Sequence, residues 1–304
     1  MIVWLASYPR SGNTLLRTVL KQSMGLDSYS DEGIKAIVGL TDKAKKEFGH
    51  IALPKPWDEF YREATASPTL HLVKTHLPPR DNQPVIYVVR DGRRSIVSYR
   101  SFHKEFSPEH EVDFASLVLG DDYYGGWSDH HERWFTGERP RMLVRYEELV
   151  HAHDGLLARL AQFIGHTGAV EPWKNPFEKL QQENPRFFRI GESKWEGAPG
   201  WTPFVDSAFF LLHGGLMKSL GYSTTQEIQS AVDWLSEEQV QFLEAARSLA
   251  RQKLMYEHAS HERLALIERL DAQVKDLSRV CDERLQVIEV LDAEVKRRSA
   301  RTGS

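Results

Sequence analysis

The chain has 304 residues, of which 41% are apolar and 27% are charged, and its formal net charge is −4. This composition is typical of a soluble globular protein, and the length allows one large domain with an appendage. The negative charge argues against a general nucleic-acid-binding protein. No apolar run approaches the roughly 18 residues of a membrane span, and no secretory signal is recognisable, so we predict a cytoplasmic protein without a membrane span. The single cysteine, Cys281, excludes a disulfide framework and a thiolate metal cluster.

Basic residues are concentrated in two stretches of this acidic chain. Residues 1–26 carry three basic residues and no acidic one, and residues 70–100 carry six basic residues against two acidic ones. A local excess of positive charge, assembled from separate segments, raises the local concentration of oppositely charged ligands. The distribution therefore favours a small polyanionic ligand.

The N-terminal segment predicts a strand, a tight loop and a helix. Residues 2–7 form an apolar run, residues 15–20 have helical apolar spacing, and Pro9 and Gly12 interrupt the pattern between them. This arrangement directs backbone N–H groups and a helix N-terminus at one point, which favours an anion and above all phosphate. An ordinary strand-to-helix turn is the alternative. The loop region also supplies side-chain donors at Arg10, Ser11 and Thr14.

The loop differs from the P-loop of nucleoside triphosphatases. When Gly12 is aligned with the second glycine of G-x-x-x-x-G-K-[ST], Ser7 occupies the first glycine position and Asn13 the lysine position. The lysine that reaches the terminal phosphates is therefore missing. A kinase that uses ATP and magnesium remains an alternative, but it would need a lysine from elsewhere.

Further apolar runs at residues 69–75, 85–89 and 142–146 predict strands, and helices are predicted over 93–104 and 147–164. Strands that alternate with helices indicate an α/β fold, with a P-loop-like parallel sheet flanked by helices. Ligands of such sheets bind at the carboxyl ends of the strands. Several side chains that carry chemistry fall at or just past these predicted ends, namely Arg10, Lys74, His76, Arg90 and Tyr146.

The C-terminal part predicts a long helix or coiled-coil arm. Residues 226–253 are predicted to be helical, and the segment 262–272 recurs at 283–293, three heptads later. Most core positions of this repeat are apolar, with Ile267, Val274, Cys281, Ile288 and Val295 at a, and Leu270, Leu277, Arg284 and Leu291 at d. β-Branched residues at a with leucine at d favour a parallel two-stranded coil. We therefore predict a homodimer through residues 256–298; a helix folded back on its own domain is the alternative.

These patterns divide the chain into three predicted parts. Residues 26–70 contain acidic helical pieces and three prolines, and we interpret them as irregular cover of the first part. The predicted parts are a catalytic domain at 1–222, a helical linker at 223–255 and an oligomerisation arm at 256–304.

Four segments, in this order, resemble motifs of the cytosolic-type sulfotransferases. Residues 8–14 resemble the 5′-phosphosulfate loop Tyr-Pro-Lys/Arg-Ser-Gly-Asn/Thr-Thr, and residues 74–78 read Lys-Thr-His-Leu-Pro as in that family. Residues 90–98 resemble the segment whose arginine and serine, eight apart, hold a 3′-phosphate, and residues 146–149 resemble Tyr-Glu-Asp-Leu. The resemblance covers residues 1–222.

The resemblance implies 3′-phosphoadenosine 5′-phosphosulfate as the sulfuryl donor, and it implies transfer without a metal. It makes His76 the catalytic base, Arg90 and Ser98 the 3′-phosphate ligands and Tyr146 an adenine contact. It also assigns the donor phosphosulfate to the loop residues Arg10, Ser11, Gly12, Asn13 and Thr14.

Other positions depart from the family pattern. Arg189 and Gly191 stand where the family has Arg-Lys-Gly, with Ile190 in place of the lysine, and whether Lys194 replaces that charge is open. The resemblance further implies that Phe177 and Leu15 contact adenine, with Leu15 standing where the family has a tryptophan. It also implies that His130 contacts the acceptor.

The chemistry supports this interpretation independently. Sulfuryl transfer to a hydroxyl needs a base, and a histidine with an ordinary pKa of about 6.5 suits that role at neutral pH. Arg10 and Lys74 suit the charge that develops around the transferred group. We predict in-line transfer to an acceptor hydroxyl or amine of a small molecule, glycan or peptide. A non-catalytic coiled-coil scaffold is the second alternative.

Overall fold

The computed structural model describes residues 1–31, 41–107, 112–183 and 195–302. Its sheet is parallel throughout, in the order β2-β3-β1-β4-β5. The strands are β1 (Ile2–Ser7), β2 (Ser28–Ser30), β3 (His71–Thr75), β4 (Val85–Val89) and β5 (Arg141–Arg145). The predicted parallel α/β sheet flanked by helices is therefore confirmed.

Helices cover both faces of the sheet. The first nine in chain order are α1 (Asn13–Met24), α2 (Asp42–Glu47), α3 (Trp57–Ala66), α4 (Gly92–Phe106), α5 (Phe114–Leu119), α6 (Trp127–Phe135), α7 (Tyr146–Val150), α8 (Asp154–Ile164) and α9 (Phe177–Glu183). They are followed by α10 (Pro203–Ser219), α11 (Thr225–Val232) and α12 (Glu237–Thr302). Helices α1, α7 and α8 pack on one face, and α4, α6 and α10 pack on the other.

The central strand β1 shows how the sequence builds these two layers. Its side chains alternate between the faces, so Ile2, Trp4 and Ala6 join the core beneath α4, α6 and α10, while Val3 and Leu5 join the core beneath α1 and α8. All five side chains are buried. A parallel strand covered on both faces is expected to be a continuous apolar run, as this one is.

The carboxyl ends of the strands meet at one edge of the sheet. Ala6 of β1 is in register with Thr75 of β3, and Val89 of β4 is in register with Arg145 of β5. The residues that follow these strands therefore emerge side by side, which brings the four predicted motifs to a common edge.

The interpretation of residues 26–70 as irregular cover is wrong in part. The segment contains β2, which extends the sheet beyond β3, together with α2 and α3. β2 has the sequence Ser-Tyr-Ser and three residues only. A short polar strand has neither the length nor the alternation that sequence patterns detect.

Two predicted helices are interrupted. The helix expected over 147–164 is divided into α7 and α8, because the His153 side chain caps a new helix by accepting a hydrogen bond from the Leu156 N–H at 3.3 Å. The helix expected over 226–253 ends at Val232 and restarts at Glu237. There Ser236 and Gln239 bond reciprocally through side chain and backbone, as in a capping box.

The chain forms two compact units, residues 1–251 and residues 252–304. Within the first unit, the beginning of α12 is held to α6 by an ion pair between Arg247 and Asp129 at 2.6 Å. Among the described residues, no helix has the length and apolar content needed to cross a membrane.

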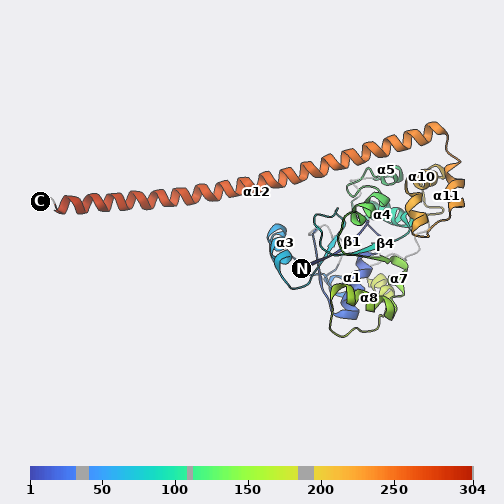
Figure 1. The fold of residues 1–304 in the computed structure, drawn as a ribbon, viewed down its shortest axis with the longest axis horizontal. Coiled ribbons are helices and arrows are strands. Elements are labelled where there is room, and N and C mark those ends of the chain that lie inside the picture. Colours follow the sequence, from blue (N-terminus) through green and yellow to red (C-terminus); the bar gives the residue numbers. More distant parts are fainter. Residues whose placement is uncertain (32–40, 108–111, 184–194, 303–304) are drawn as a thin grey trace. The chain divides into compact units, whose positions relative to one another are not determined.

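The second unit is the continuation of α12, which confirms the predicted long C-terminal helix (Figure 1). Cys281 is exposed. The other apolar residues of the predicted coil core are exposed as well, namely Ile267, Leu270, Val274, Leu277, Ile288, Leu291 and Val295. A single chain thus leaves this apolar stripe in contact with solvent.

Candidate functional site

The loop between β1 and α1 adopts a compact left-handed conformation. Arg10 has a φ of 61° and Gly12 a φ of 112°, and the Ser11 N–H closes a turn on the Tyr8 carbonyl at 3.2 Å. A Cβ atom at Gly12 would lie 2.7 Å from Cδ2 of Tyr146. Glycine is therefore required here both by the backbone angle and by the close approach of the Tyr146 ring.

Two predicted ligand side chains of this loop are engaged inside the fold. The Ser11 hydroxyl lies 3.1 Å from that of Ser95 on α4, and the Asn13 amide donates to the Leu5 carbonyl at 2.7 Å. Both residues are buried and fasten the loop to its neighbours. Among the residues that the structure describes, no side chain caps α1, so its first backbone N–H groups are the part of this segment suited to an anion.

The residues predicted to hold a 3′-phosphate and adenine come together beside this loop. The Arg90 guanidinium lies 4.2 Å from the centre of the Tyr146 ring and donates to the Arg10 carbonyl at 3.5 Å. Nε of Arg10 in turn lies 3.4 Å from the Ser98 hydroxyl. Three strand ends and α4 thus contribute to one cationic cluster, and the 4% exposure of Arg90 lowers its pKa through desolvation.

His76 follows β3 directly and is held in one tautomer. Its Nδ1 lies 2.7 Å from the Ser7 carbonyl oxygen, which can only accept, so Nδ1 carries the proton and Nε2 carries a lone pair. Burial lowers the pKa of His76 well below its usual range, and the nearby charge of Lys74 lowers it further. The ring is therefore neutral at physiological pH, as a general base must be.

Lys74 lies two residues before His76 on β3 and is 6% exposed. Burial lowers the pKa of this lysine, while the carboxylate of Asp31 opposes the shift. Burial also raises the pKa of Asp31, whose N–H donates to the Lys74 carbonyl at 3.2 Å. Asp31 did not emerge from the sequence as a site residue, because it follows β2, the strand that the pattern missed.

His130 supports the main chain at His76 and does not line an open pocket. It is 1% exposed, and its Nε2 donates to the His76 carbonyl at 2.8 Å. Its Nδ1 accepts from the Tyr87 hydroxyl at 2.8 Å. The expectation that His130 contacts an acceptor is therefore not met, because both ring nitrogens are occupied within the core.

Arg17, counted among the basic residues of the N-terminal stretch, is structural. Its Nε donates to the Ser28 hydroxyl at 2.7 Å, and its guanidinium packs 4.7 Å from the centre of the Phe48 ring. Burial lowers its pKa to about 9. Arg17 is thus engaged inside the fold, and its charge adds to burial in lowering the pKa of the neighbouring Lys74.

The remaining predicted contacts lie at the margin of this cluster. Leu15 packs on the core beneath α1 and α8, and Phe177 packs with Phe102 and Phe106 around Ala44. Thr14 is partly exposed in the first turn of α1. Other predicted positions lie outside the described residues, namely Arg189, Ile190, Gly191 and Lys194.

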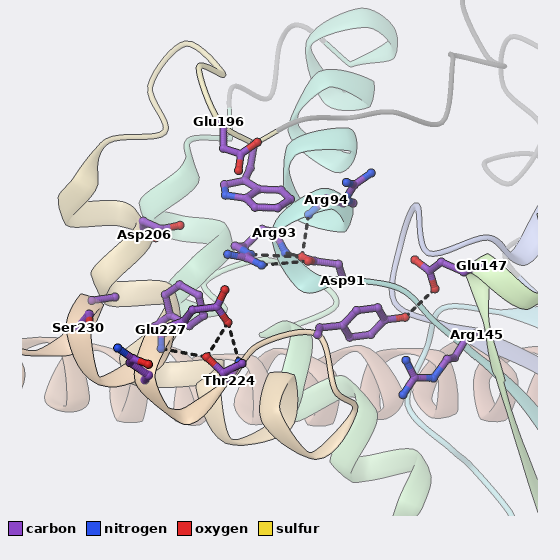
Figure 2. A pocket seen from close by; sticks show the side chains of 15 residues that line it. Asp91, Arg93, Arg94, Arg145, Glu147, Glu196, Asp206, Thr224, Glu227 and Ser230 are labelled. Carbon is purple, nitrogen blue, oxygen red and sulfur yellow. Dashed lines mark hydrogen bonds and ion pairs between the residues drawn. The ribbon is translucent and has the colours of Figure 1, made fainter.

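A cavity of about 1170 Å³ lies beside the site, between the start of α4, the residues after β5 and helices α10 and α11 (Figure 2). Arg93 pairs there with Asp91 at 3.1 Å and lies 3.9 Å from the centre of the Trp195 ring. Glu147 accepts a hydrogen bond from Tyr222 at 2.9 Å. The ion pair between Arg93 and the N-cap residue Asp91 fixes the beginning of α4.

A family model for the sulfotransferase domain matches residues 2–198, which is more than half of the chain. The chain belongs to the sulfotransferase domain family. All four motif segments, from Tyr8 to Leu149, lie within the matched region. The cluster of Arg10, Arg90 and Ser98 is therefore part of the sulfotransferase domain.

Individual relatives are more distant. The chain is 28% identical to human Sulfotransferase 4A1 over 179 residues, which cover 54% of this chain and 59% of that protein. It is 26% identical to mouse Sulfotransferase 1B1 over 178 residues, with 54% and 58% covered. These matches span less than two thirds of each relative. A crystal structure of mouse sulfotransferase SULT7A1 complexed with PAP matches 77% of this chain and 88% of its own, at 20% identity and a TM-score of 0.45.

Among the described residues of this sulfotransferase domain, no group of three or more His, Cys, Asp or Glu side chains is arranged to hold a metal ion. The polar groups at the site are instead a neutral imidazole, buried cationic side chains and an uncapped helix N-terminus. Such a set is suited to take up a proton and to stabilise anionic oxygens.

Proposed function

We propose that the protein transfers the sulfuryl group of 3′-phosphoadenosine 5′-phosphosulfate to an acceptor hydroxyl or amine, with His76 as the base. The observation that carries this proposal is the hydrogen bond from Nδ1 of His76 to the Ser7 carbonyl at 2.7 Å. Because Nδ1 carries the proton, Nε2 carries none. His76 lies at the edge of the sheet where β3, the strand of Lys74, ends and where the loop at residues 8–14 begins. The family membership supports the same reaction class.

The chain offers residues that fit such a donor. The backbone N–H groups at the start of α1 suit the 5′-phosphosulfate, and the absence of a Cβ at Gly12 allows the Tyr146 ring to lie against this loop. Arg90 and Ser98 suit the 3′-phosphate, since arginine pairs with phosphate oxygens through two parallel hydrogen bonds. Tyr146, which already stacks with Arg90, offers an aromatic face to adenine.

In the proposed reaction His76 takes the proton of the acceptor as its oxygen or nitrogen attacks sulfur. The bond between sulfur and the bridging phosphate oxygen breaks in line, and adenosine 3′,5′-bisphosphate leaves. Lys74 and Arg10 stabilise the charge on the sulfuryl and leaving oxygens. As in phosphoryl transfer, positioning and electrostatic stabilisation supply most of the rate, and the protein forms no covalent intermediate.

The pH dependence follows from the two buried groups. Because the pKa of His76 is lowered, we expect kcat to stay constant as the pH falls to about 6.5, the ordinary pKa of histidine, and to decrease only below it. Because the pKa of Lys74 is also lowered, kcat should decrease on the alkaline side below the ordinary lysine pKa. A kcat–pH profile between pH 4.5 and 10.5 measures both limbs. An acid limb centred at or above the ordinary histidine pKa would contradict the assignment.

An ATP-dependent kinase is the alternative enzyme, and ligand binding separates the two. Asn13 occupies the lysine position of a nucleoside triphosphate loop and is bonded to β1. We expect adenosine 3′,5′-bisphosphate to raise the melting temperature far more than ATP with magnesium does. A transfer assay with ³⁵S-labelled donor and a panel of phenols, alcohols and amines then tests the reaction. Stabilisation by ATP with magnesium alone would favour the kinase.

We further infer that residues 256–298 of α12 form a parallel dimer and that residues 1–222 are the catalytic part, joined by a linker at 223–255. The exposed apolar stripe with β-branched a positions supports this inference. A cytoplasmic location and a small-molecule, glycan or peptide acceptor belong to the same proposal, on the strength of the resemblance to cytosolic-type enzymes.

Removing residues 256–304 should therefore convert a dimer into a monomer while kcat per site is retained, because the proposed base and donor ligands all precede the arm. Light scattering coupled to size exclusion measures the mass of both forms. Substitution of Ile267 and Ile288 by lysine should also convert the dimer into a monomer, without shortening the chain, because it places charge at two a positions of the proposed coil. Equal masses for the full-length and shortened chains would refute the dimer.

A further inference from the structure

Two side chains of helix α6 donate N–H hydrogen bonds to the backbone carbonyls of the two consecutive residues that follow β3. Nε2 of His130 donates to the carbonyl of His76 at 2.8 Å, and Nε1 of Trp134 donates to the carbonyl of Leu77 at 3.1 Å. His130 and Trp134 are four residues apart, so they share one face of α6. Both are 1% exposed. The backbone on the carboxyl side of His76 is thereby bonded twice to one rigid element.

His130 is itself fixed in protonation and orientation. The Tyr87 hydroxyl on β4 donates to its Nδ1 at 2.8 Å, and the Tyr8 ring packs edge-on at a centroid distance of 5.9 Å. Burial lowers the pKa of His130 to about 3, so the ring stays neutral. Its Nε2 proton is then directed at the His76 carbonyl.

His76 is consequently held from both sides. Its Nδ1 is bonded to Ser7 on β1, and its carbonyl is bonded to His130 on α6. Fixing the carbonyl fixes the peptide plane from which the ring projects, while the Nδ1 bond fixes the ring itself. The direction of the Nε2 lone pair is therefore determined by β1 and α6 together.

We propose that His130 and Trp134 are positioning residues for the base His76. The proposal rests on the proposed sulfuryl transfer and adds to it the device that aims the base. Displacement of a reacting group by about 1 Å can lower a rate about 100-fold. Loosening this clamp should accordingly reduce kcat, while the donor site formed by Arg90, Ser98 and Tyr146 keeps its affinity.

The fold contains a matched control for the His130 clamp. His213 on α10 donates from Nε2 to the Val118 carbonyl at 2.8 Å and accepts from the Ser128 hydroxyl at 2.7 Å. It is 1% exposed, and burial lowers its pKa to about 3 as well. His213 thus makes the same two kinds of hydrogen bond as His130: Nε2 donates to a backbone carbonyl, and Nδ1 accepts from a hydroxyl. Neither of these bonds involves His76. A purely structural histidine should behave like His213 when it is replaced.

The test compares three variants of the full chain. His130→Phe should lower kcat by about 10- to 100-fold, with the KM for donor and the Kd for adenosine 3′,5′-bisphosphate within about two-fold of the wild type. His130→Gln keeps an N–H donor near the Nε2 position and should recover most of the lost kcat. His213→Phe should lower the melting temperature to a similar extent and leave kcat unchanged.

Unchanged kcat in a folded His130→Phe variant would overturn the proposal, and so would an equal loss of kcat in His213→Phe. If His130→Phe does not fold, Trp134→Phe removes the second donor and keeps an aromatic ring; it should lower kcat without changing donor affinity, and no loss of kcat would again refute the clamp. Absence of transfer by the wild type would instead refute the proposed function.

Discussion

Replacing His76 with alanine is expected to lower kcat for sulfuryl transfer by about 10²- to 10⁴-fold, the usual contribution of a general base. The variant retains Arg90, Ser98 and Tyr146, so the Kd for adenosine 3′,5′-bisphosphate should change little. The comparison requires a single-turnover measurement with labelled donor and a calorimetric titration with the product nucleotide. Together they separate loss of the base from loss of the binding site.

His71→Ala is a suitable control, because His71 begins the same strand that His76 follows and lies at the opposite edge of the sheet. It packs against Phe60 and does not reach the site. We expect this variant to keep its kcat. Turnover at the wild-type rate in His76→Ala would remove the base assignment, whatever the control shows.

Replacing Arg90 with alanine is expected to weaken donor binding. Arg90 is 4% exposed and lies against Tyr146, and its loss removes a charge-assisted contact to the 3′-phosphate. A hydrogen bond to a charged group contributes about 1.5–3 kcal/mol, which corresponds to a roughly 10- to 100-fold higher Kd. Calorimetric titration with adenosine 3′,5′-bisphosphate measures the change.

The size of this effect should depend on the 3′-phosphate. We expect Arg90→Ala to bind adenosine 5′-phosphate almost as the wild type does, because that nucleotide lacks the group which Arg90 contacts. Arg159→Ala removes a charge from the surface of α8 and should leave both affinities unchanged. Equal affinity of wild type and Arg90→Ala for the bisphosphate would contradict the assignment of the 3′-phosphate site.

Much of the fold could be predicted because parallel strands buried on both faces are apolar throughout. The runs at residues 2–7, 69–75, 85–89 and 142–146 correspond to β1, β3, β4 and β5 within one or two residues. Parallel strands place their carboxyl ends at one edge, so the convergence of Arg10, Arg90 and Tyr146 could be expected from the order of the motifs.

Other features had no sequence signal. β2 is short and polar, so neither the strand nor Asp31 beside Lys74 could be found from apolar periodicity. The sequence also did not indicate which loop side chains are used inside the fold. Ser11 and Asn13 match a ligand motif, yet their side chains form hydrogen bonds with α4 and β1. A motif specifies which residues are present, while the packing of neighbouring elements decides which of their atoms stay available.

His130 illustrates the same limit. The sequence around His130 did not reveal that both of its nitrogens are bonded within the core, because Tyr87 and His76 are remote in sequence. Only the packing of α6 across β3 and β4 makes those bonds. Long-range hydrogen bonds between side chain and backbone leave no periodic pattern.

A crystal structure with adenosine 3′,5′-bisphosphate tests the central claim most directly, because it locates both phosphates at once. We predict the 5′-phosphate on the N–H groups at the start of α1, the 3′-phosphate between Arg90 and Ser98, and Nε2 of His76 facing the side from which an acceptor would attack. A 3′-phosphate bound instead by Arg93 and Arg94 in the neighbouring cavity, or a nucleotide remote from His76, would contradict the account.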